Sequence, residues 1–325
     1  MELPRALRRA VDHALDGMAL SEIVAAAADL SQRYRDERRD GRFHVATDKT
    51  ARAYLAVRLP ATYAAVRASF AAVAAARPDF APASLLDAGA GPGTALWAAA
   101  DCWPGLGDAL LLEASPAFRS WGERLTATIG AQRVVWRTAD IATDVPDGAS
   151  YDLVTLGYVL NELAPGLRAA LLDRLWQSTA DMLVIIEPGT PAGWQRILAA
   201  RAQLLAAGAH LIAPCPHSEA CPLQPPDWCH FARRVARSRL HRLAKGADVP
   251  WEDEKFIYLA VSRKPGVSQA ARIIAPPRKG SGRVTLKLCG ADGTANERLL
   301  SRRDGDAYRQ ASRADWGESL GEKKI

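Results

Sequence analysis

The chain has 325 residues, 49% of them hydrophobic, and a formal net charge of +6 at pH 7. This length allows one large α/β domain with additions, or two domains, around a sizeable core. Five cysteines are an odd set that argues against a disulfide-built secreted protein, and neither a membrane span nor a transit peptide is apparent. We therefore expect a monomer in a reducing cytoplasm, or in the mitochondrial matrix, with no membrane partner.

The first part of the chain predicts helices, and the part after it predicts alternating strands and helices. Ala-rich stretches with helical periodicity fill residues 1–80, and Pro60 is expected to kink or divide the second of them. From Ala83 the pattern becomes that of βαβ units. We expect strands in SLLDA, DALLLEASP, RVVWRTADI, YDLVTLG, DMLVIIEPG and KFIYLAVSRK, and helices in PGLRAALLDRLWQST and GWQRILAARAQLLAAG.

A glycine-rich turn follows the first of these strands in LLDAGAGPGTALWAA. Gly89, Gly91 and Gly93 allow a tight turn and let a ligand approach the backbone closely. The G-x-G pattern alone is weak evidence for a nucleotide-type cofactor. Its position between a strand and a helix strengthens the prediction, and we expect this turn to bind a cofactor.

Acidic residues near this turn favour S-adenosylmethionine over NAD. Asp87 precedes the first glycine, and Glu113 ends the next strand twenty-four residues after Gly89, where it can accept both ribose hydroxyls. The turn reads G-x-G-x-G, with Pro92, instead of the G-x-G-x-x-G of pyrophosphate binders. Asp140, at the end of the third strand, is placed to reach an adenine amino group.

The predicted fold class is therefore α/β, a doubly wound, Rossmann-like sheet of the class I S-adenosylmethionine-dependent methyltransferase type. Continuous apolar runs such as LVIIEP are typical of parallel strands covered on both faces. We expect an N-terminal helical region at 1–80, a methyltransferase-like domain at 81–264 with a Cys-rich insertion around 210–245, and a basic β segment at 265–325. The last segment is expected either as a small module or as the antiparallel edge of the main sheet.

Candidate catalytic residues follow the fourth strand. Asn161 and Glu162 in GYVLNEL occupy the position where such folds face the transferred methyl group, although the pair can also cap the next helix. Glu187, at the end of the fifth strand, can line the same pocket or be structural. The chain lacks the Asn-Pro-Pro-aromatic motif of amino-directed methyltransferases, so the catalytic residues stay open.

Three cysteines within one Pro-rich loop, and a fourth far along the chain, predict a metal centre. Cys215, Cys221 and Cys229 have five and seven residues between them, and Cys289 lies in VTLKLCG. These gaps are wider than the knuckles usual for structural zinc, and Cys-Pro pairs are typical of iron–sulfur ligand runs. The pattern favours an iron–sulfur cluster, with zinc as the alternative, and Cys102 is expected to pack as a small hydrophobic residue.

The positive charge is concentrated in the second half of the chain. From Arg263 onward there are fourteen Lys and Arg against seven Asp and Glu, and Cys229–Lys245 contains no acid. Read as a helix, that segment places Arg233, Arg234 and Arg237 on one side, which suits contact with an RNA backbone. The alternative is a solvated helix.

Several motifs together resemble one known family. RLPATYAAV, LLDAGAGPGT, EPGTPAGW, APCPHSEACPLQPPDWCHFARRVARSR and EKFIYLAVSRK, in that order, are similar to the small-ribosomal-subunit assembly methyltransferase-like family of mitochondria and bacteria. The resemblance runs from about residue 50 to Cys289, and the three-Cys run is its most specific part.

The resemblance implies a class I methyltransferase fold that binds S-adenosylmethionine and a partner in the small ribosomal subunit and its rRNA. It also implies a 4Fe-4S cluster held by four Cys, which are Cys215, Cys221, Cys229 and Cys289 in this chain. Three functions stay open: an rRNA methyltransferase, a non-catalytic assembly factor that uses S-adenosylmethionine and the cluster structurally, and a zinc-bearing methyltransferase with a protein or small-molecule substrate. The basic segment argues against the third.

Overall fold

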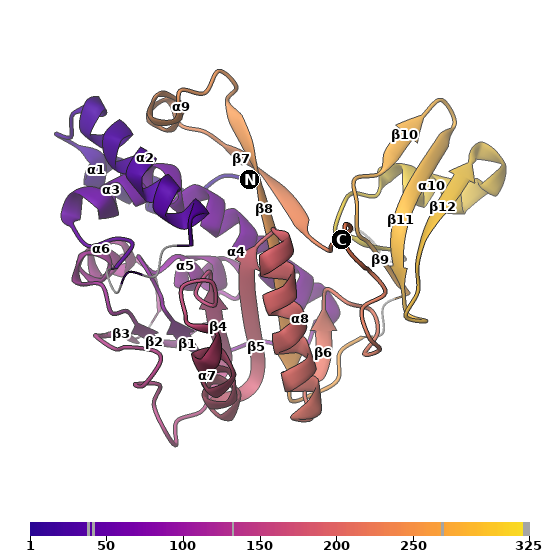
Figure 1. Cartoon of the computed structure of the whole chain (residues 1–325), viewed down its shortest axis with the longest axis horizontal. Coiled ribbons are helices and arrows are strands. Elements are labelled where there is room, and N and C mark those ends of the chain that lie inside the picture. Colours follow the sequence, from indigo (N-terminus) through magenta and orange to yellow (C-terminus); the bar gives the residue numbers. More distant parts are fainter. Residues whose placement is uncertain (38–39, 41–42, 132, 268–269, 321–325) are drawn as a thin grey trace.

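The structure of the protein is a computed structural model, which describes residues 1–37, 40, 43–131, 133–267 and 270–320. It contains two β-sheets of different size (Figure 1). The larger sheet has eight strands and lies in the main body. The smaller has five and projects from it as an arm at the C-terminal end of the chain. The functional side chains predicted above lie in two places. One is the carboxyl ends of the parallel strands of the large sheet, and the other is the junction of the two sheets.

The N-terminal region is helical, as predicted. Thr47 caps the third helix, because its side chain accepts the Thr50 amide while the Thr50 side chain accepts the Thr47 amide. Pro60 lies in the first turn of the fourth helix, and the break falls at Arg58, so the predicted division is confirmed. The helices are α1 (Arg5–Leu15), α2 (Leu20–Arg35), α3 (Asp48–Val57) and α4 (Leu59–Ala76).

The large sheet has the strand order β3-β2-β1-β4-β5-β8-β6, with β7 paired to β8. The first five strands of this order are parallel, while β8 runs antiparallel to β5, β6 and β7. The strands are β1 (Ser84–Ala88), β2 (Asp108–Leu112), β3 (Arg133–Arg137), β4 (Tyr151–Gly157), β5 (Thr179–Pro188), β6 (His210–Ala213), β7 (Phe231–Ala236) and β8 (Trp251–Ser262). The direction of the crossovers changes between β1 and β4, which is where ligands bind in such sheets.

Helices cover both faces of this sheet, so the predicted doubly wound arrangement is confirmed. In Figure 1, α7 and α8 lie in front of the strands, while α4 and α5 lie behind them. The central strand β5 is buried along most of its length, as its unbroken apolar run predicted. The helices that follow the strands are α5 (Thr94–Cys102), α6 (Pro116–Thr126), α7 (Pro165–Gln177), α8 (Pro191–Ala206) and α9 (Arg239–Lys245).

Helix α4 corrects one expectation from the sequence. Leu59–Ala76 is long and apolar enough to cross a membrane by length and composition, although no such run was expected. In the structure 67% of this helix is buried inside the protein. Its apolar surface contributes to the protein core, where Phe70 and Val73 are fully buried.

The C-terminal segment forms a separate small sheet and not an edge of the large one. It contains β9 (Ala271–Ile273), β10 (Arg278–Gly280), β11 (Arg283–Gly290), β12 (Ala295–Ser301) and β13 (Ser319–Leu320), with η1 (Arg302–Asp304) and α10 (Gly305–Arg313) after β12. Its own core joins Val284, Leu286, Leu288 and Leu300 to Ala311. The predicted boundaries of the three regions stay a prediction.

The basic segment after Cys229 is not the predicted single helix. Residues 231–236 form β7, which pairs with the exposed half of β8, and only Arg239–Lys245 is helical. Phe231 and Val235 are buried while Arg234 is exposed, so the segment alternates with the period of a strand. The helical expectation was wrong because pairing with β8, a contact distant in sequence, overrides local helix propensity. The short strand β6 was not predicted either.

Candidate cofactor cleft and cysteine pocket

The glycine turn after β1 has the backbone conformation that glycine alone adopts readily. Gly89, Gly91 and Gly93 have φ angles of 71°, 54° and 81°. A Cβ on Gly89 would lie 2.6 Å from Val159, whereas one on Gly91 would meet nothing closer than Phe118 at 4.0 Å. The turn is therefore packed against the protein at Gly89 and open at Gly91, which fits a cofactor that lies against the backbone there.

Glu113, immediately after β2, lies against this turn. Its carboxylate accepts hydrogen bonds from the amides of Gly91, at 2.7 Å, and Ser115, at 2.7 Å. Burial raises the pKa of Glu113, and these backbone donors oppose the rise. Each oxygen of a carboxylate accepts more than one hydrogen bond, so the predicted ribose contact remains compatible with this arrangement.

Asp87 and Asp140 lie in different environments. Asp87 is buried at the end of β1, where it accepts a 2.6 Å hydrogen bond from the Thr155 hydroxyl, and burial raises its pKa to about 7. Asp140 is exposed in the turn after β3, where its side chain accepts the Ala142 amide. The structure brings Asp87 and Glu113 together at the glycine turn and leaves the adenine contact of Asp140 a prediction.

Two further carboxylates lie at the ends of β4 and β5. Glu162 is solvent-exposed in the turn after β4. Glu187 is fully buried, accepts the Leu160 amide at 3.0 Å and pairs with Arg196 at 2.6 Å. Burial raises the pKa of Glu187 to about 7 although Arg196 opposes it. Glu187 thus holds the turn after β4, where Asn161 lies.

Asn161 lies in a cleft that the N-terminal helices help to form. The cleft extends between α2, the ends of β4 and β5, and α9. Arg237, predicted to contact RNA, lines this same cleft. The other residues that line it include Tyr34, Arg35, Arg58, Thr190 and Lys245. A predicted catalytic residue and a predicted RNA-contacting residue therefore share one cleft, which the sequence did not indicate.

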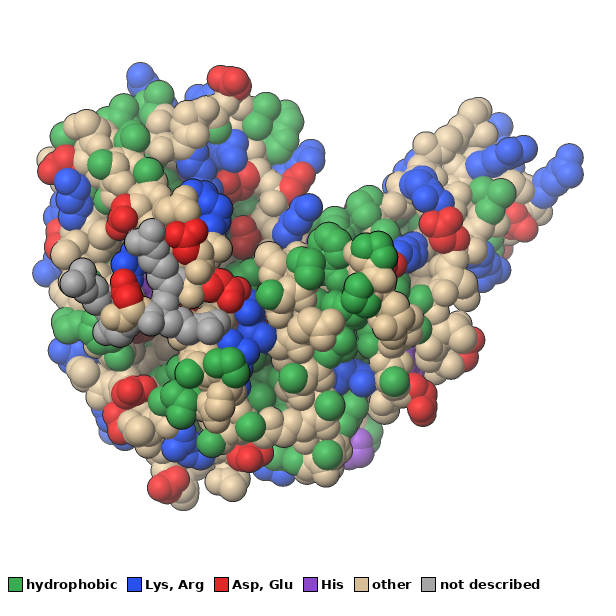
Figure 2. Space-filling model, viewed as in Figure 1, with side chains coloured by type: hydrophobic (Ala, Val, Ile, Leu, Met, Phe, Trp, Pro, Cys, Tyr) green, Lys and Arg blue, Asp and Glu red, His purple; other side chains and the backbone are tan. Residues whose placement is uncertain are grey.

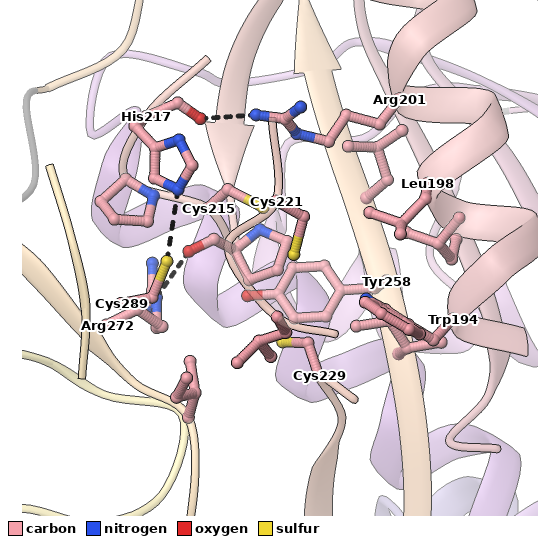
Figure 3. Close-up of a pocket in the computed structure, with 17 residues that line it drawn as sticks. Trp194, Leu198, Arg201, Cys215, His217, Cys221, Cys229, Tyr258, Arg272 and Cys289 are labelled. Atoms are coloured by element: carbon pink, nitrogen blue, oxygen red, sulfur yellow. Dashed lines mark hydrogen bonds between the residues drawn. The ribbon is translucent and has the colours of Figure 1, made fainter. Parts of the chain in front are cut away.

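The four predicted metal ligands meet in one pocket between the two sheets (Figure 3). Cys215 follows β6, Cys221 and Cys229 lie in the loop before β7, and Cys289 belongs to β11 of the small sheet. Leu223, Ile274 and Trp194 form an apolar cluster with Cys289 beside them. The pocket therefore joins cysteines that are 74 residues apart, as their numbers in the chain show.

Three of the four thiols of this pocket resist ionisation. Burial, with the neighbouring thiols adding to it, raises the pKa of Cys289 to about 12 and raises that of Cys229 well above its ordinary value. Burial also raises the pKa of Cys215. A bound cation reverses this tendency, because it compensates thiolates at short range. Four convergent thiols fit an iron–sulfur or zinc centre chemically, since thiolates are the ligands both prefer.

The pocket also contains polar side chains that the sequence did not indicate. Arg201 donates to the carbonyls of His217, at 2.8 Å, and Glu219, at 2.7 Å, and so fixes the loop between Cys215 and Cys221. His217 lies 3.3 Å from the Cys289 sulfur. Among the described residues, no group of three or more His, Cys, Asp or Glu has the geometry to hold a metal ion. The pocket gathers the donors without closing them around an ion.

A hydrogen bond connects the cysteine loop to the cleft that contains Asn161. The Trp228 indole N–H donates to the Gly189 carbonyl at 3.1 Å, one residue after β5 and one before Thr190 of the cleft. A Cβ on Gly189 would lie 2.7 Å from the Phe256 amide nitrogen, so β8 passes too close for a larger residue.

The fold and the glycine turn define the class of this protein. A doubly wound sheet with β8 antiparallel beside β5, a glycine turn after β1 and an acid after β2 is the class I S-adenosylmethionine methyltransferase-like fold. The chain belongs to the family described as mitochondrial small ribosomal subunit Rsm22, whose model matches residues 48–321. This confirms the resemblance found in the sequence.

Two named relatives are mitochondrial proteins. The human ribosome assembly protein METTL17, mitochondrial, is 29% identical over 287 residues, which cover 82% of this chain and 61% of that protein. The Schizosaccharomyces pombe Rsm22-cox11 tandem protein 2, mitochondrial, is 25% identical over 324 residues, 84% of this chain and 43% of that protein. The chain therefore spans less than two thirds of the length of these relatives.

Solved structures of similar shape include two methyltransferases. Magnesium protoporphyrin IX methyltransferase from Synechocystis with bound SAM has 15% identity and a TM-score of 0.42, covering 77% of this chain and 99% of that one. The plantazolicin methyltransferase BpumL in complex with SAH has 14% identity and a TM-score of 0.41, covering 75% and 98%.

Proposed function

We propose that this protein is an assembly factor of the small ribosomal subunit that binds S-adenosylmethionine and a 4Fe-4S cluster and acts on the subunit's rRNA. The observation that carries this proposal is the convergence of Cys215, Cys221, Cys229 and Cys289 in one pocket of a family member. The name of the human relative, a ribosome assembly protein, supports the partner.

S-adenosylmethionine is the cofactor that the glycine turn supports best. Gly91 leaves room for a ligand against the backbone, and Glu113 offers carboxylate oxygens beside it. Asp87 joins β1 to β4 through the Thr155 hydroxyl and does not need to touch the ligand. In this proposal Gly89 and Gly93 shape the turn, while Asp140 contributes the adenine contact.

The four cysteines would hold the cluster, with zinc as the alternative occupant. Because the cluster supplies positive charge among buried sulfurs, it would stabilise thiolates that the apolar pocket otherwise keeps protonated. The chain itself contributes Arg201, which fixes the loop, and Arg272, which donates to the Pro214 carbonyl at 2.9 Å next to Cys215. Arg201 and Arg272 thus hold in position the loop that carries Cys215 and Cys221.

Methyl transfer to rRNA is the finer part of the proposal. In it, Asn161, which lines the cleft, orients the acceptor, and the carboxylate of Glu162, the next residue, accepts the proton. The alternative is a factor that binds S-adenosylmethionine without catalysis. The cleft beside Asn161 is lined by the cations Arg35, Arg58, Arg237 and Lys245 and by the carboxylate Glu37, and Arg237 and Lys245 pair with Glu252.

Mass spectrometry of small-subunit rRNA tests the enzyme directly. We expect rRNA from cells without this protein to lack one methyl mark that returns with the wild-type gene and not with an Asn161→Ala variant. Sedimentation of the protein with small-subunit precursors, and not with mature ribosomes, would test the assembly role. An unchanged set of methyl marks, together with such co-sedimentation, would decide for the non-catalytic factor.

A further inference from the structure

The charge on the β7 strand is largely compensated by its partner strand. Arg234 pairs with Asp253 at 2.9 Å, and Arg237 pairs with Glu252 at 3.1 Å. Lys245 of α9 reaches the same Glu252 at 2.7 Å. Because Arg234 and Arg237 each pair with a carboxylate, while Arg233 is in no ion pair among the described residues, this surface offers an RNA backbone less net charge than its sequence suggests.

A second concentration of charge lies at the outer end of the small sheet. Residues 276–303 contain seven Lys and Arg against two Asp and Glu. We define the basic tip as five exposed side chains from β10, β11 and η1: Arg278, Lys279, Arg283, Arg302 and Arg303. Figure 2 shows Lys and Arg side chains along the outer end of this projecting arm.

Strand register gathers these five residues at one end of the sheet. Gly280 pairs with Arg283, and Arg283 pairs with Ser301, so the β10–β11 turn and the end of β12 lie side by side. The Arg302 side chain lies over Gly282 of that turn, where a Cβ would meet it at 3.2 Å. Cys289 pairs with Ala295 at the opposite end of β11. The sheet thus has a cysteine end and a cationic end.

The cations of the basic tip are nearly uncompensated. Arg278 pairs with Glu297 at 2.6 Å, and both side chains are exposed. Within the part of the chain that the structure describes, Lys279, Arg283, Arg302 and Arg303 form no ion pair. Leu299, 61% exposed, lies on the same face of the sheet as Thr285 and Arg278.

We propose that the basic tip binds the phosphate backbone of RNA, and that it, and not β7, is the main electrostatic contact with the small subunit. The proposal rests on the RNA partner proposed above. Four of the five cations are Arg, whose planar fork matches phosphate oxygens. The other end of the module is fixed at the cysteine pocket, so the tip projects freely as the arm's outer end (Figure 1).

The test measures binding of the full-length protein to a fluorescein-labelled fragment of small-subunit rRNA across a salt series. We expect the quadruple variant K279E/R283E/R302E/R303E to lose on the order of 100-fold in affinity at low salt, and the slope of log K against log salt to flatten by about 3, because fewer counterions are released. The charge-preserving variant K279R/R283K/R302K/R303K should keep most of the affinity, which also controls for folding of the arm.

The β7 variant R233E/R234E is matched to the tip variant R302E/R303E, which reverses the same number of charges in two adjacent arginines, and we expect the β7 variant to lose less affinity than this tip variant. Equal losses for both variants, or a larger loss for the β7 variant, would overturn the assignment to the tip while leaving the RNA partner in place. If wild-type protein does not bind the fragment at any salt concentration, the RNA partner itself fails. If anionic lipid vesicles bind wild type and not the quadruple variant, and RNA binds both equally, the tip is a membrane contact.

Discussion

The cofactor cleft and the cysteine pocket both bury acidic groups, and they compensate them by different means. In the cleft, the chain itself supplies donors: two amides to Glu113, a hydroxyl to Asp87 and a guanidinium to Glu187. In the pocket, Cys229 faces the other thiols and apolar side chains, and although His217 lies 3.3 Å from the Cys289 sulfur and Arg201 lies beside Cys215, burial raises the pKa of all three thiols. The buried carboxylates of the cleft are therefore balanced by donors of the protein itself, whereas thiolates in the pocket would need an added cation.

The largest effect is expected when one of the four thiols of the pocket is removed. In protein purified without oxygen, we expect Cys229→Ser to abolish the broad absorbance at about 400 nm that iron–thiolate centres give. The variant should also unfold at a lower temperature, because the free energy of metal binding contributes to the free energy of folding. Cys102→Ser, on α5 in the core, should leave the absorbance unchanged. A colourless wild type that contains one equivalent of zinc would assign zinc to the same four ligands.

The next largest effect is expected at the glycine turn. Gly91→Arg fills the space that the structure leaves open above the backbone, so calorimetry should detect no binding of S-adenosylmethionine. Gly17→Arg is a matched control, since Gly17 also has a positive φ, of 76°, and open space around it. Equal affinity in the Gly91 variant would place the cofactor elsewhere.

A smaller effect on S-adenosylmethionine binding is expected at Glu113. We expect Glu113→Ala to weaken S-adenosylmethionine binding by about ten- to a hundredfold, equivalent to about 1.5–3 kcal/mol for hydrogen bonds to a charged group. Glu113→Gln keeps the shape and one acceptor and should lose less. Calorimetry that finds wild-type affinity in both variants would contradict the ribose contact.

A different kind of effect, on stability and not on binding, is a pH dependence that comes from Asp87. Its folded pKa of about 7 lies above its ordinary value of 3.8, so between these values the folded state holds a proton that the unfolded state has released. The contribution to stability is therefore greatest below the ordinary value and is lost as the pH rises through about 7. Urea midpoints at several pH values should fall less steeply for Asp87→Asn than for wild type, and parallel curves would contradict this.

Much of the large sheet could be predicted because its strands are continuous apolar runs. Leu183–Ile186 sits in the buried centre of β5, and Glu113 falls at a strand end that its spacing from Gly89 already indicated. The four cysteines could be grouped by the family resemblance, and the structure places them in one pocket.

The other features of the fold and the sites depend on contacts between residues far apart in the sequence, which local sequence patterns do not indicate. β7 contains Arg233 and Arg234 in a run that suits a helix, and only pairing with β8 makes it a strand. Arg201 and Arg272 reach the cysteine loop from α8 and β9, so nothing near the cysteines in sequence indicates them. For the same reason, the meeting of Arg237 and Asn161 in one cleft was not foreseen.

The hydrogen bond from Trp228 to the Gly189 carbonyl has a consequence for how the two sites communicate. Trp228 precedes the ligand Cys229, and Gly189 precedes Thr190 in the wall of the cleft. A shift of the cysteine loop would therefore be transmitted to that wall. If occupancy of one site changes the affinity of the other, thermodynamic reciprocity requires the same factor in both directions, so S-adenosylmethionine would raise the affinity for iron by as much as iron raises the affinity for S-adenosylmethionine.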